Sequence, residues 1–125
     1  MIPEELQPRA LSEIIAFYLD GTRDDELDGS ALHQVDTNSR IDANTRFYVL
    51  PTPDYDENDQ PDWEALGPDI ASLAVEHGLF DGILGEHLSS TLYLVRNRAA
   101  DSSPDQIAAA FDYYLEHDTW PDWLA

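Results

Sequence analysis

The sequence predicts a single α+β domain, mostly helical with about four helices and a small two- or three-stranded sheet. Its 125 residues are 42% hydrophobic, enough to bury one core without a metal or a disulfide. Apolar residues recur at helical spacing in several segments, whereas one short run is aromatic and β-branched like a strand. We find no internal repeat and no linker, so residues 1–125 are interpreted as a single acidic globular domain.

The first helix is expected between Pro8 and Gly21. Proline suits a first helical turn because it has no backbone N–H to leave unpaired, and glycine suits the end of the segment. Between them, one apolar stripe follows the spacing of an amphipathic helix: Leu11, Ile14, Ile15 and Tyr18. Residues 20–28 carry five acids and one arginine, which predicts an exposed loop or a poorly ordered bridge.

A strand is expected at residues 46–50, where Arg-Phe-Tyr-Val-Leu combines aromatic and β-branched side chains. Pro51 ends it, because proline cannot donate the hydrogen bond that a central strand needs. Residues 51–63 then mix prolines with acids and amides, and we expect a long exposed loop there.

Pro68 suits the start of a second helix, and Gly78 suits its left-handed C-terminal cap. The apolar face of this helix is expected to hold Ile70, Leu73, Ala74 and His77. Residues 79–84 are expected to follow as a short second strand, although the glycines at 82 and 85 weaken that prediction.

Residues 89–99 fit two secondary structures. Leu92, Val95 and Ala99 continue a helical stripe from Leu88, and the serines at 89 and 90 could cap it. The run Thr-Leu-Tyr-Leu-Val alone is typical of a strand. We favour the helix and keep the strand as the alternative.

The last helix has the most complete set of signals. Ser103 is a capping residue, Pro104 suits the first helical position, and Gln106 completes a capping box. One broad apolar face follows, made of Ile107, Ala110, Phe111, Tyr114 and Leu115. The helix is expected to end at His117, before a short aromatic tail at residues 120–124.

The strongest compositional signal is charge. The chain has 26 acidic residues against 6 arginines and no lysine, a formal net charge of -20. Such a surface repels nucleic acid and anionic lipid and attracts basic proteins, so we expect no direct nucleic-acid or membrane partner. There is no cysteine, no leader-like N-terminus and no apolar run long enough to span a bilayer. We therefore expect a cytoplasmic protein.

The sequence contains no pattern of catalytic or metal-binding residues. Asp54, Asp56 and Asn58 match the start of a calcium loop, but Asp59 replaces its glycine and Ala65 replaces its closing glutamate. The histidines lack HExxH spacing, the serines lack a GxSxG elbow, and the glycines form no phosphate loop. We therefore expect a protein that is not an enzyme, with no catalytic residue, metal, cofactor or small-molecule substrate.

The candidate site is an acidic loop interleaved with aromatic residues. Its residues are Asp54, Tyr55, Asp56, Glu57, Asp59, Asp62, Trp63 and Glu64. One interpretation is a solvated loop whose Trp63 folds back onto the core. The other is a partner-binding surface, in which the aromatic side chains become buried anchors and the carboxylates pair with arginine or lysine of a basic protein.

Several segments share features with one known family. They are the strand and acidic loop at 47–59, the Glu-His-Gly-Leu helix end at 76–79, Leu-Val-Arg-Asn-Arg-Ala at 94–99, and the closing helix at 103–118 with its aromatic pair. On these features, residues 45–123 resemble the small acidic bacterial immunity proteins of polymorphic-toxin and contact-dependent growth inhibition systems. The resemblance implies a cytoplasmic, non-enzymatic inhibitor that binds one cognate toxin domain, and it implies a helix at residues 89–99.

Our leading hypothesis is an immunity-type inhibitor whose acidic face docks on the basic substrate cleft of a toxin. A nuclease is the expected case, because its substrate is a polyanion. Two alternatives come from other classes. A halophilic small domain would carry the same charge as an adaptation to high salt, and a DNA mimic would use its carboxylates in place of phosphates to inhibit a DNA-binding protein.

Overall fold

The structure, a computed structural model, describes residues 7–35, 40–79 and 82–125. Within these ranges four strands form one sheet in the order β1-β3-β2-β4, and every neighbouring pair is antiparallel. The strands are β1 (Arg9–Ala10), β2 (Ser30–Gln34), β3 (Arg46–Pro51) and β4 (Ile83–Leu84). The α+β class is confirmed. The sheet is larger than expected because the sequence predicts neither β1 nor β2; β1 is only two residues long, too short for a periodic signal.

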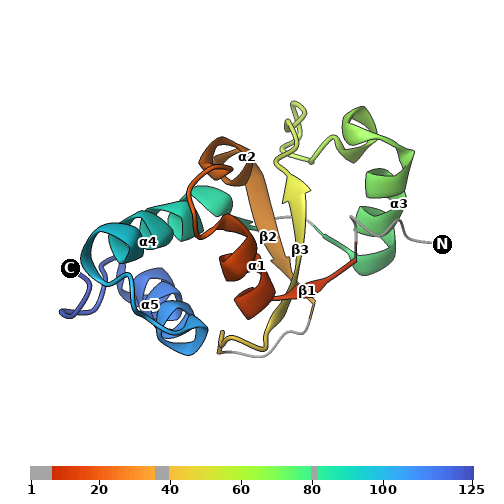
Figure 1. Ribbon diagram of the computed structural model, residues 1–125. Coiled ribbons are helices and arrows are strands. Elements are labelled where there is room, and N and C mark those ends of the chain that lie inside the picture. Colours follow the sequence, from red (N-terminus) through yellow and green to blue (C-terminus); the bar gives the residue numbers. More distant parts are fainter. Residues whose placement is uncertain (1–6, 36–39, 80–81) are drawn as a thin grey trace.

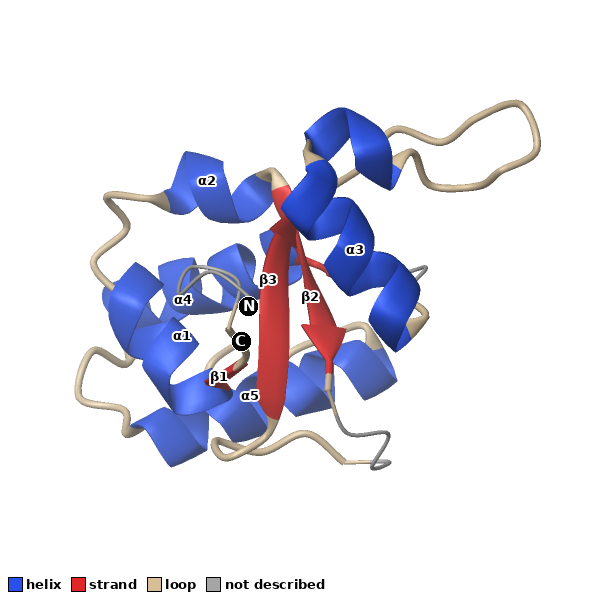
Figure 2. Cartoon of the chain, turned by 90° about the vertical axis from the view of Figure 1, so that its right-hand side faces the viewer, coloured by secondary structure: helices blue, strands red, loops and turns tan. Residues whose placement is uncertain are grey.

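Helices cover both faces of this sheet. They are α1 (Leu11–Tyr18), α2 (Asp24–Asp28), the 3-10 helix η2 (Trp63–Leu66), α3 (Pro68–His77), α4 (Gly85–Arg98) and α5 (Pro104–His117). α1, α4 and α5 lie on one side of the strands and α3 lies on the other, so the sheet is a middle layer (Figure 1). Seen from the α3 side, α3 lies in front of β2 and β3 (Figure 2). No helix of the described ranges is long and apolar enough to cross a membrane.

The strand β3 separates two hydrophobic cores. Because successive side chains point to opposite faces, Phe47 packs with Phe111 and the other apolar residues of α1, α4 and α5. Tyr48 and Leu50 point the other way and pack with Leu73 of α3. Burial on both faces is the reason that an unbroken apolar run, rather than an alternating one, forms this strand.

The N-terminal helix α1 begins at Leu11 rather than at Pro8. Arg9 and Ala10 precede it as β1, paired with Phe47 and Arg46 of β3, so these residues are extended rather than helical. The predicted apolar stripe is confirmed, since all four of its residues are buried in the larger core.

The prediction of an exposed loop at residues 20–28 is wrong for its second half, where α2 forms. Leu27 is fully buried in the larger core and holds this short helix in place. A single apolar side chain among acids is too weak a pattern to predict a helix, and the tertiary packing of Leu27 decides the outcome.

Sequence periodicity gives no signal for β2, because Leu32 is its only large aliphatic residue. Its first four residues are nevertheless buried. The register runs from Ser30 opposite Pro51 to Gln34 opposite Phe47, so pairing with β3 covers the whole strand. Long-range pairing, more than its own composition, makes this segment a strand.

The helix at residues 89–99 is confirmed as part of α4, and the strand alternative is wrong. α4 begins at Gly85, so the serines at 89 and 90 lie inside the helix and do not cap it. Of the strand expected at 79–84, the described residues form only β4, while residues 80–81 lie outside the description. A side chain on Gly85 would overlap the carbonyl oxygen of Leu27, so glycine allows α4 to start directly against α2.

α3 and α5 match their predicted starts and caps. Gly78 ends α3 with a left-handed φ of 62°. In the capping box of α5, the Gln106 N–H donates to Ser103 Oγ at 3.2 Å and the Ser103 N–H donates to Gln106 Oε1 at 2.8 Å. His77 is the exception on the apolar face of α3: it is exposed, and its ring lies 5.3 Å from that of Tyr48.

The residues after α5 fold back against the helices. Trp120 stacks on Tyr114 with ring centroids 4.3 Å apart, and its indole N–H donates to Thr91 Oγ1 of α4 at 3.0 Å. Leu124 is fully buried in the larger core. The predicted aromatic tail therefore packs on the α4–α5 layer through Trp120 and Leu124, while Trp123 is exposed.

The close approach at the start of α4 gives a first prediction. Gly85→Ala should lower the free energy of unfolding by more than about 2 kcal/mol, because the new methyl group must displace the backbone of α2. Gly29→Ala is the matched control: its Cβ would lie 3.6 Å from the Asp25 carbonyl oxygen, an ordinary contact. Urea unfolding of both variants measures the difference, and equal stabilities would contradict the close approach.

Candidate partner-binding surface

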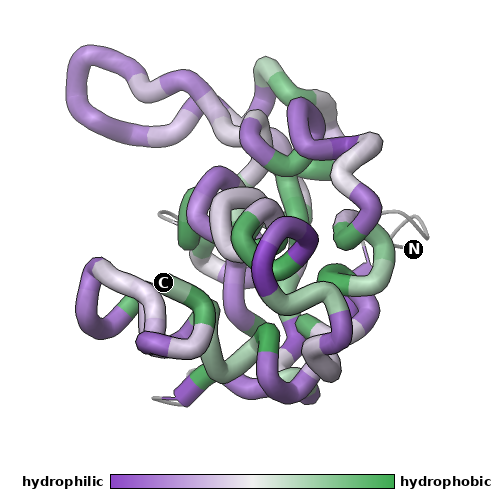
Figure 3. Tube along the Cα trace, turned by 60° about the vertical axis from the view of Figure 1, so that its left-hand side comes forward, coloured by the Kyte–Doolittle hydropathy of each residue, from purple (hydrophilic) through white to green (hydrophobic). Residues whose placement is uncertain are grey.

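The acidic loop at residues 52–62 is a hairpin that extends beyond the end of β3. Tyr55 and Pro61 form an antiparallel bridge across it. The Asp62 N–H donates to the Asp54 carbonyl at 2.8 Å, and the Asp56 N–H donates to the Gln60 carbonyl at 2.9 Å. The loop stands away from the helices and sheet (Figure 2) and is one of the longest hydrophilic stretches of the chain trace (Figure 3).

The carboxylate of Asp56 organises the tip of this hairpin. Its Oδ1 accepts the N–H of Asn58 at 2.8 Å and the N–H of Gln60 at 3.0 Å. Asp59 follows with a left-handed φ of 60°, a conformation that aspartate tolerates better than most residues. A side chain that mimics a turn in this way gives the loop a defined shape, although the sequence contains no glycine here.

Most of the predicted site residues are exposed on this hairpin or just after it. The exposed members are Asp54, Tyr55, Asp56, Glu57, Asp59, Asp62 and Glu64. Tyr55 is 44% exposed and is the aromatic side chain that the loop presents to solvent. Seven of the eight predicted site residues are therefore accessible, and Tyr55 is the aromatic one among them.

Trp63 does not belong to the exposed set. It is 7% exposed and packs in the smaller core with Leu50 and Leu73, with its ring 5.6 Å from that of His33. This is the first of the two interpretations of the sequence, in which Trp63 folds back onto the core. Trp63 fixes the base of the hairpin, and Tyr55 is left as the accessible aromatic anchor.

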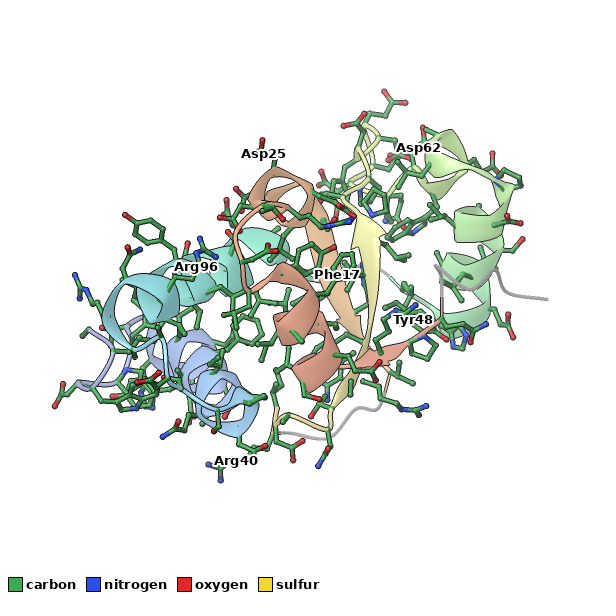
Figure 4. All side chains as sticks on the ribbon, in the orientation of Figure 1. Phe17, Asp25, Arg40, Tyr48, Asp62 and Arg96 are labelled. Atoms are coloured by element: carbon green, nitrogen blue, oxygen red, sulfur yellow. The ribbon has the colours of Figure 1, made fainter. Side chains whose placement is uncertain are left out.

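A second acidic segment lies at the same edge of the sheet. Ser30 pairs with Pro51, so the chain before β2 and the chain after β3 leave the sheet at one end. The Thr52 N–H donates to the Gly29 carbonyl at 3.0 Å and joins the two segments directly. Asp25 and Asp62 both lie along this edge (Figure 4).

We call this surface the acidic edge. Its members are Asp20, Asp24, Asp25, Glu26, Asp28, Asp54, Asp56, Glu57, Asp59, Asp62 and Glu64. They are eleven of the 26 acidic residues of the chain, supplied by two segments that are far apart in the sequence. The first segment escaped the sequence-based prediction because only the pairing of β2 with β3 brings it beside the loop.

Two arginines contact the acidic edge within the described residues. Arg23 lies 3.7 Å from Glu26, and its guanidinium carbon is 4.5 Å from the ring centre of Phe17. Arg96 reaches from α4 and donates to Asp24 Oδ2 at 2.9 Å and to the Leu19 carbonyl at 3.2 Å. Within the described residues, most carboxylates of the acidic edge therefore form no ion pair with an arginine.

Arg96 also fixes the connection between α1 and α2. The Leu19 carbonyl is at the C-terminal end of α1, where a cation is favourable, and Asp24 is the first residue of α2. Gly21 lies beneath the guanidinium with φ 81°, and a Cβ there would approach Arg96 Cζ to 2.9 Å. Glycine is therefore required for this arginine to reach across.

One carboxylate of the acidic edge is held ionised by its own turn. The pKa of Asp20 is lowered, first by the Thr22 backbone N–H and then by the Thr22 hydroxyl, which both donate to Oδ1. Arg23 and Arg96 act in the same direction. The negative charge of this side chain therefore persists below the usual titration range of aspartate.

The described residues contain no group of three or more histidine, aspartate or glutamate side chains placed to hold a metal ion. Asp54 and Asp56, which match the start of a calcium loop in the sequence, make hydrogen bonds within the hairpin instead. The Asp54 carbonyl and the Asp56 carboxylate accept hydrogen bonds from the hairpin itself. What the hairpin offers chemically is a set of exposed carboxylates together with one exposed aromatic side chain, Tyr55, which suits the binding of cations.

The role of Asp56 gives a second prediction. Asp56→Ala should speed hydrogen exchange at the Asn58 and Gln60 amides, because both lose their acceptor. Glu57→Ala removes the same charge from the neighbouring position and should leave the exchange of these amides unchanged. Amide exchange followed by NMR measures both variants, and an equal effect would show that charge rather than hydrogen bonding shapes the loop.

Tyr18 gives a third prediction. Burial raises the pKa of its hydroxyl above 10.0, and the nearby Glu26 carboxylate, 3.5 Å away, raises it further, while Arg23 opposes the shift. The neutral phenol thus stabilises the folded state below pH 10.0, and this stability is lost as pH rises through the folded pKa. Tyr18→Phe should lose less stability over the same alkaline range in urea unfolding. A parallel decline of both proteins would contradict the shift.

Comparison of the chain with protein-family models, with curated proteins and with solved structures found no match in any of the three.

Proposed function

We propose that this protein is an immunity protein, a non-enzymatic inhibitor that binds a cognate toxin domain with a basic surface. The observation that carries the proposal is the convergence of two acidic segments on one edge of the sheet. A carboxylate-rich edge of this kind competes for the cationic groups with which a nuclease holds its polyanionic substrate. The partner surface we propose is therefore the substrate cleft of a basic toxin.

The electrostatics of the acidic edge favour a fast encounter. Like charges gathered on one surface repel one another. A basic partner that binds there relieves this electrostatic repulsion. At physiological salt the field extends about 8 Å into solvent, far enough to orient an approaching cationic surface. Association is expected to be rapid and sensitive to ionic strength.

Tyr55 supplies the apolar contact that charge alone lacks. It is 44% exposed at the base of the hairpin, where the bridge to Pro61 holds its backbone. An aromatic side chain on a preorganised loop loses little conformational entropy on binding and is a frequent centre of binding energy. Affinity would then rest on Tyr55 and the association rate on the surrounding carboxylates.

The resemblance of residues 45–123 to small acidic immunity proteins supports the same proposal. It points to inhibition of one cognate toxin and to a cytoplasmic location, where such an inhibitor protects the producing cell. The ordered hairpin is compatible with a binding role.

A halophilic small domain is the second candidate. Acidic residues are also exposed away from the acidic edge, for example Asp101, Asp105 and Glu116 on and beside α5. A charge that serves solvation at high salt would be spread in this way. The two candidate functions predict different stabilities of the folded protein in dilute buffer.

The fourth prediction tests the acidic edge with a charge-matched pair of variants. The edge variant carries Asp54→Asn, Glu57→Gln and Asp59→Asn, and keeps Asp56 because it shapes the hairpin. The control carries Asp101→Asn, Asp105→Asn and Glu116→Gln, the same change in charge at α5. Stopped-flow association with the toxin domain encoded beside this chain should slow by about tenfold or more for the edge variant at low salt and little for the control.

Other outcomes point to the other hypotheses. Equal slowing by both variants, or tight binding unaffected by either, would remove the acidic edge from the mechanism. Unfolding of the wild-type protein below molar salt would indicate halophilic adaptation. Competition with duplex DNA for several unrelated DNA-binding proteins would indicate a DNA mimic.

A further inference from the structure

A shallow depression of about 340 Å³ lies on the outer face of α4, beside the acidic edge. It is lined by Asp24, Ser89, Ser90, Tyr93, Leu94 and Trp120. These residues come from three parts of the chain: α2, α4 and the turn after α5. The hairpin and Tyr55 do not contribute to it, whereas Asp24 belongs both to the depression and to the acidic edge.

The depression exists because small side chains on α4 are flanked by large ones. Ser89 and Ser90 occupy the middle of the helix face, and Tyr93 follows one turn later. Trp120 forms the opposite wall, held by its stack on Tyr114 and by its hydrogen bond to Thr91. A wall fixed by two independent contacts needs no rearrangement before a ligand binds.

The chemistry of the lining combines aromatic rings with carboxylates. Tyr93 is 59% exposed and presents a ring to solvent. Asp24 receives Arg96 on Oδ2, whereas its Oδ1 is buried and has no hydrogen-bond donor among the described residues, so a ligand must enter the depression to reach it. Asp28, next to the depression, accepts the Ser89 hydroxyl. Arg96 therefore neutralises only part of the negative charge at this place.

The protein already contains a contact of the kind that the depression offers. The guanidinium carbon of Arg96 lies 6.0 Å from the ring centre of Tyr93 while its nitrogen donates to Asp24. Aromatic faces attract guanidinium groups, and carboxylates bind them through directional hydrogen bonds. A second arginine, supplied from outside, would find the same two kinds of partner, an aromatic ring and a carboxylate, in the lining of the depression.

We infer that this depression binds an arginine side chain of the protein partner. The guanidinium lies against the Tyr93 and Trp120 rings, its N–H groups point to Asp24 and Asp28, and its aliphatic stem contacts Leu94. Arginine fits better than lysine because its planar, weakly hydrated group stacks on aromatic rings and donates from several positions. The inference rests on the proposed function, since it names one group on the basic partner that the acidic edge attracts.

The fifth prediction uses N-acetylarginine amide as the probe. Titration into the full chain should shift the Trp120 indole N–H and the Ser90 and Tyr93 amides in NMR spectra, in a saturable way. The indole signal of Trp63, buried in the smaller core, is the internal control and should not move. N-acetyl-lysine amide should bind several-fold more weakly, and N-acetyl-norleucine amide should produce no shift at Trp120.

Two variants at one exposed helix position test the geometry. Ser90→Trp fills the depression and should weaken binding of the arginine probe by at least about tenfold, the loss expected for a blocked contact. Ser90→Ala leaves the space open and should bind as the wild type does. Tyr93→Ala removes one ring from an exposed position and should also weaken binding of the arginine probe. This variant tests the same site if Ser90→Trp does not fold.

The result that overturns the inference is a shift spread over all acidic surfaces, equal for the arginine and lysine probes and unchanged in Ser90→Trp. The same variants separate the inference from the proposed function. If Ser90→Trp binds the toxin domain as tightly as Ser90→Ala while the edge variant loses association rate, the arginine site fails and the immunity function stands. If the arginine probe binds as expected but no toxin domain does, the site stands and the proposed function fails.

Discussion

The antiparallel pairing of β2 with β3 is the constraint on which the rest of the structure depends. It places Ser30 opposite Pro51 and so makes the two acidic segments leave the sheet at one edge. It also sets the faces of β3, with Phe47 in the larger core and Leu50 in the smaller one. Both cores and the acidic edge therefore derive from one strand register, and a shift by one residue would turn every side chain of β2 to the opposite face of the sheet.

The acidic edge shows how a small fold keeps many like charges together. Local hydrogen bonds give individual carboxylates a structural task, as when Asp56 shapes the hairpin and Asp20 accepts from Thr22. Arg96 bridges α4 to the beginning of α2 and joins the region to the larger core. Local bonds and one long-range bridge shape the edge, while its outer carboxylates remain open to a partner.

Sequence patterns predict α1, α3, α5 and β3 because their apolar spacing and caps are local properties, complete in Ser103 and Gln106 for α5. β2 and α2 escape prediction because each contains a single large aliphatic residue, Leu32 or Leu27, whose role is decided by distant contacts. The candidate site also has one part that the sequence predicts and one part that it does not. The acidic hairpin is visible as a local run of charge, whereas α2 joins it only through strand pairing, and no composition rule indicates whether Trp63 faces the core or solvent.

The burial of Trp63 makes the hairpin dependent on the smaller of the two cores. That core holds few large side chains, and α3 supplies Leu73 and Ala74 to it. Regions with few buried contacts open more readily than the rest of a domain. The stiffness of the hairpin thus depends on α3, which packs with Trp63 on the same face of the sheet, so sequence variation in α3 can tune recognition without altering any residue that meets the partner.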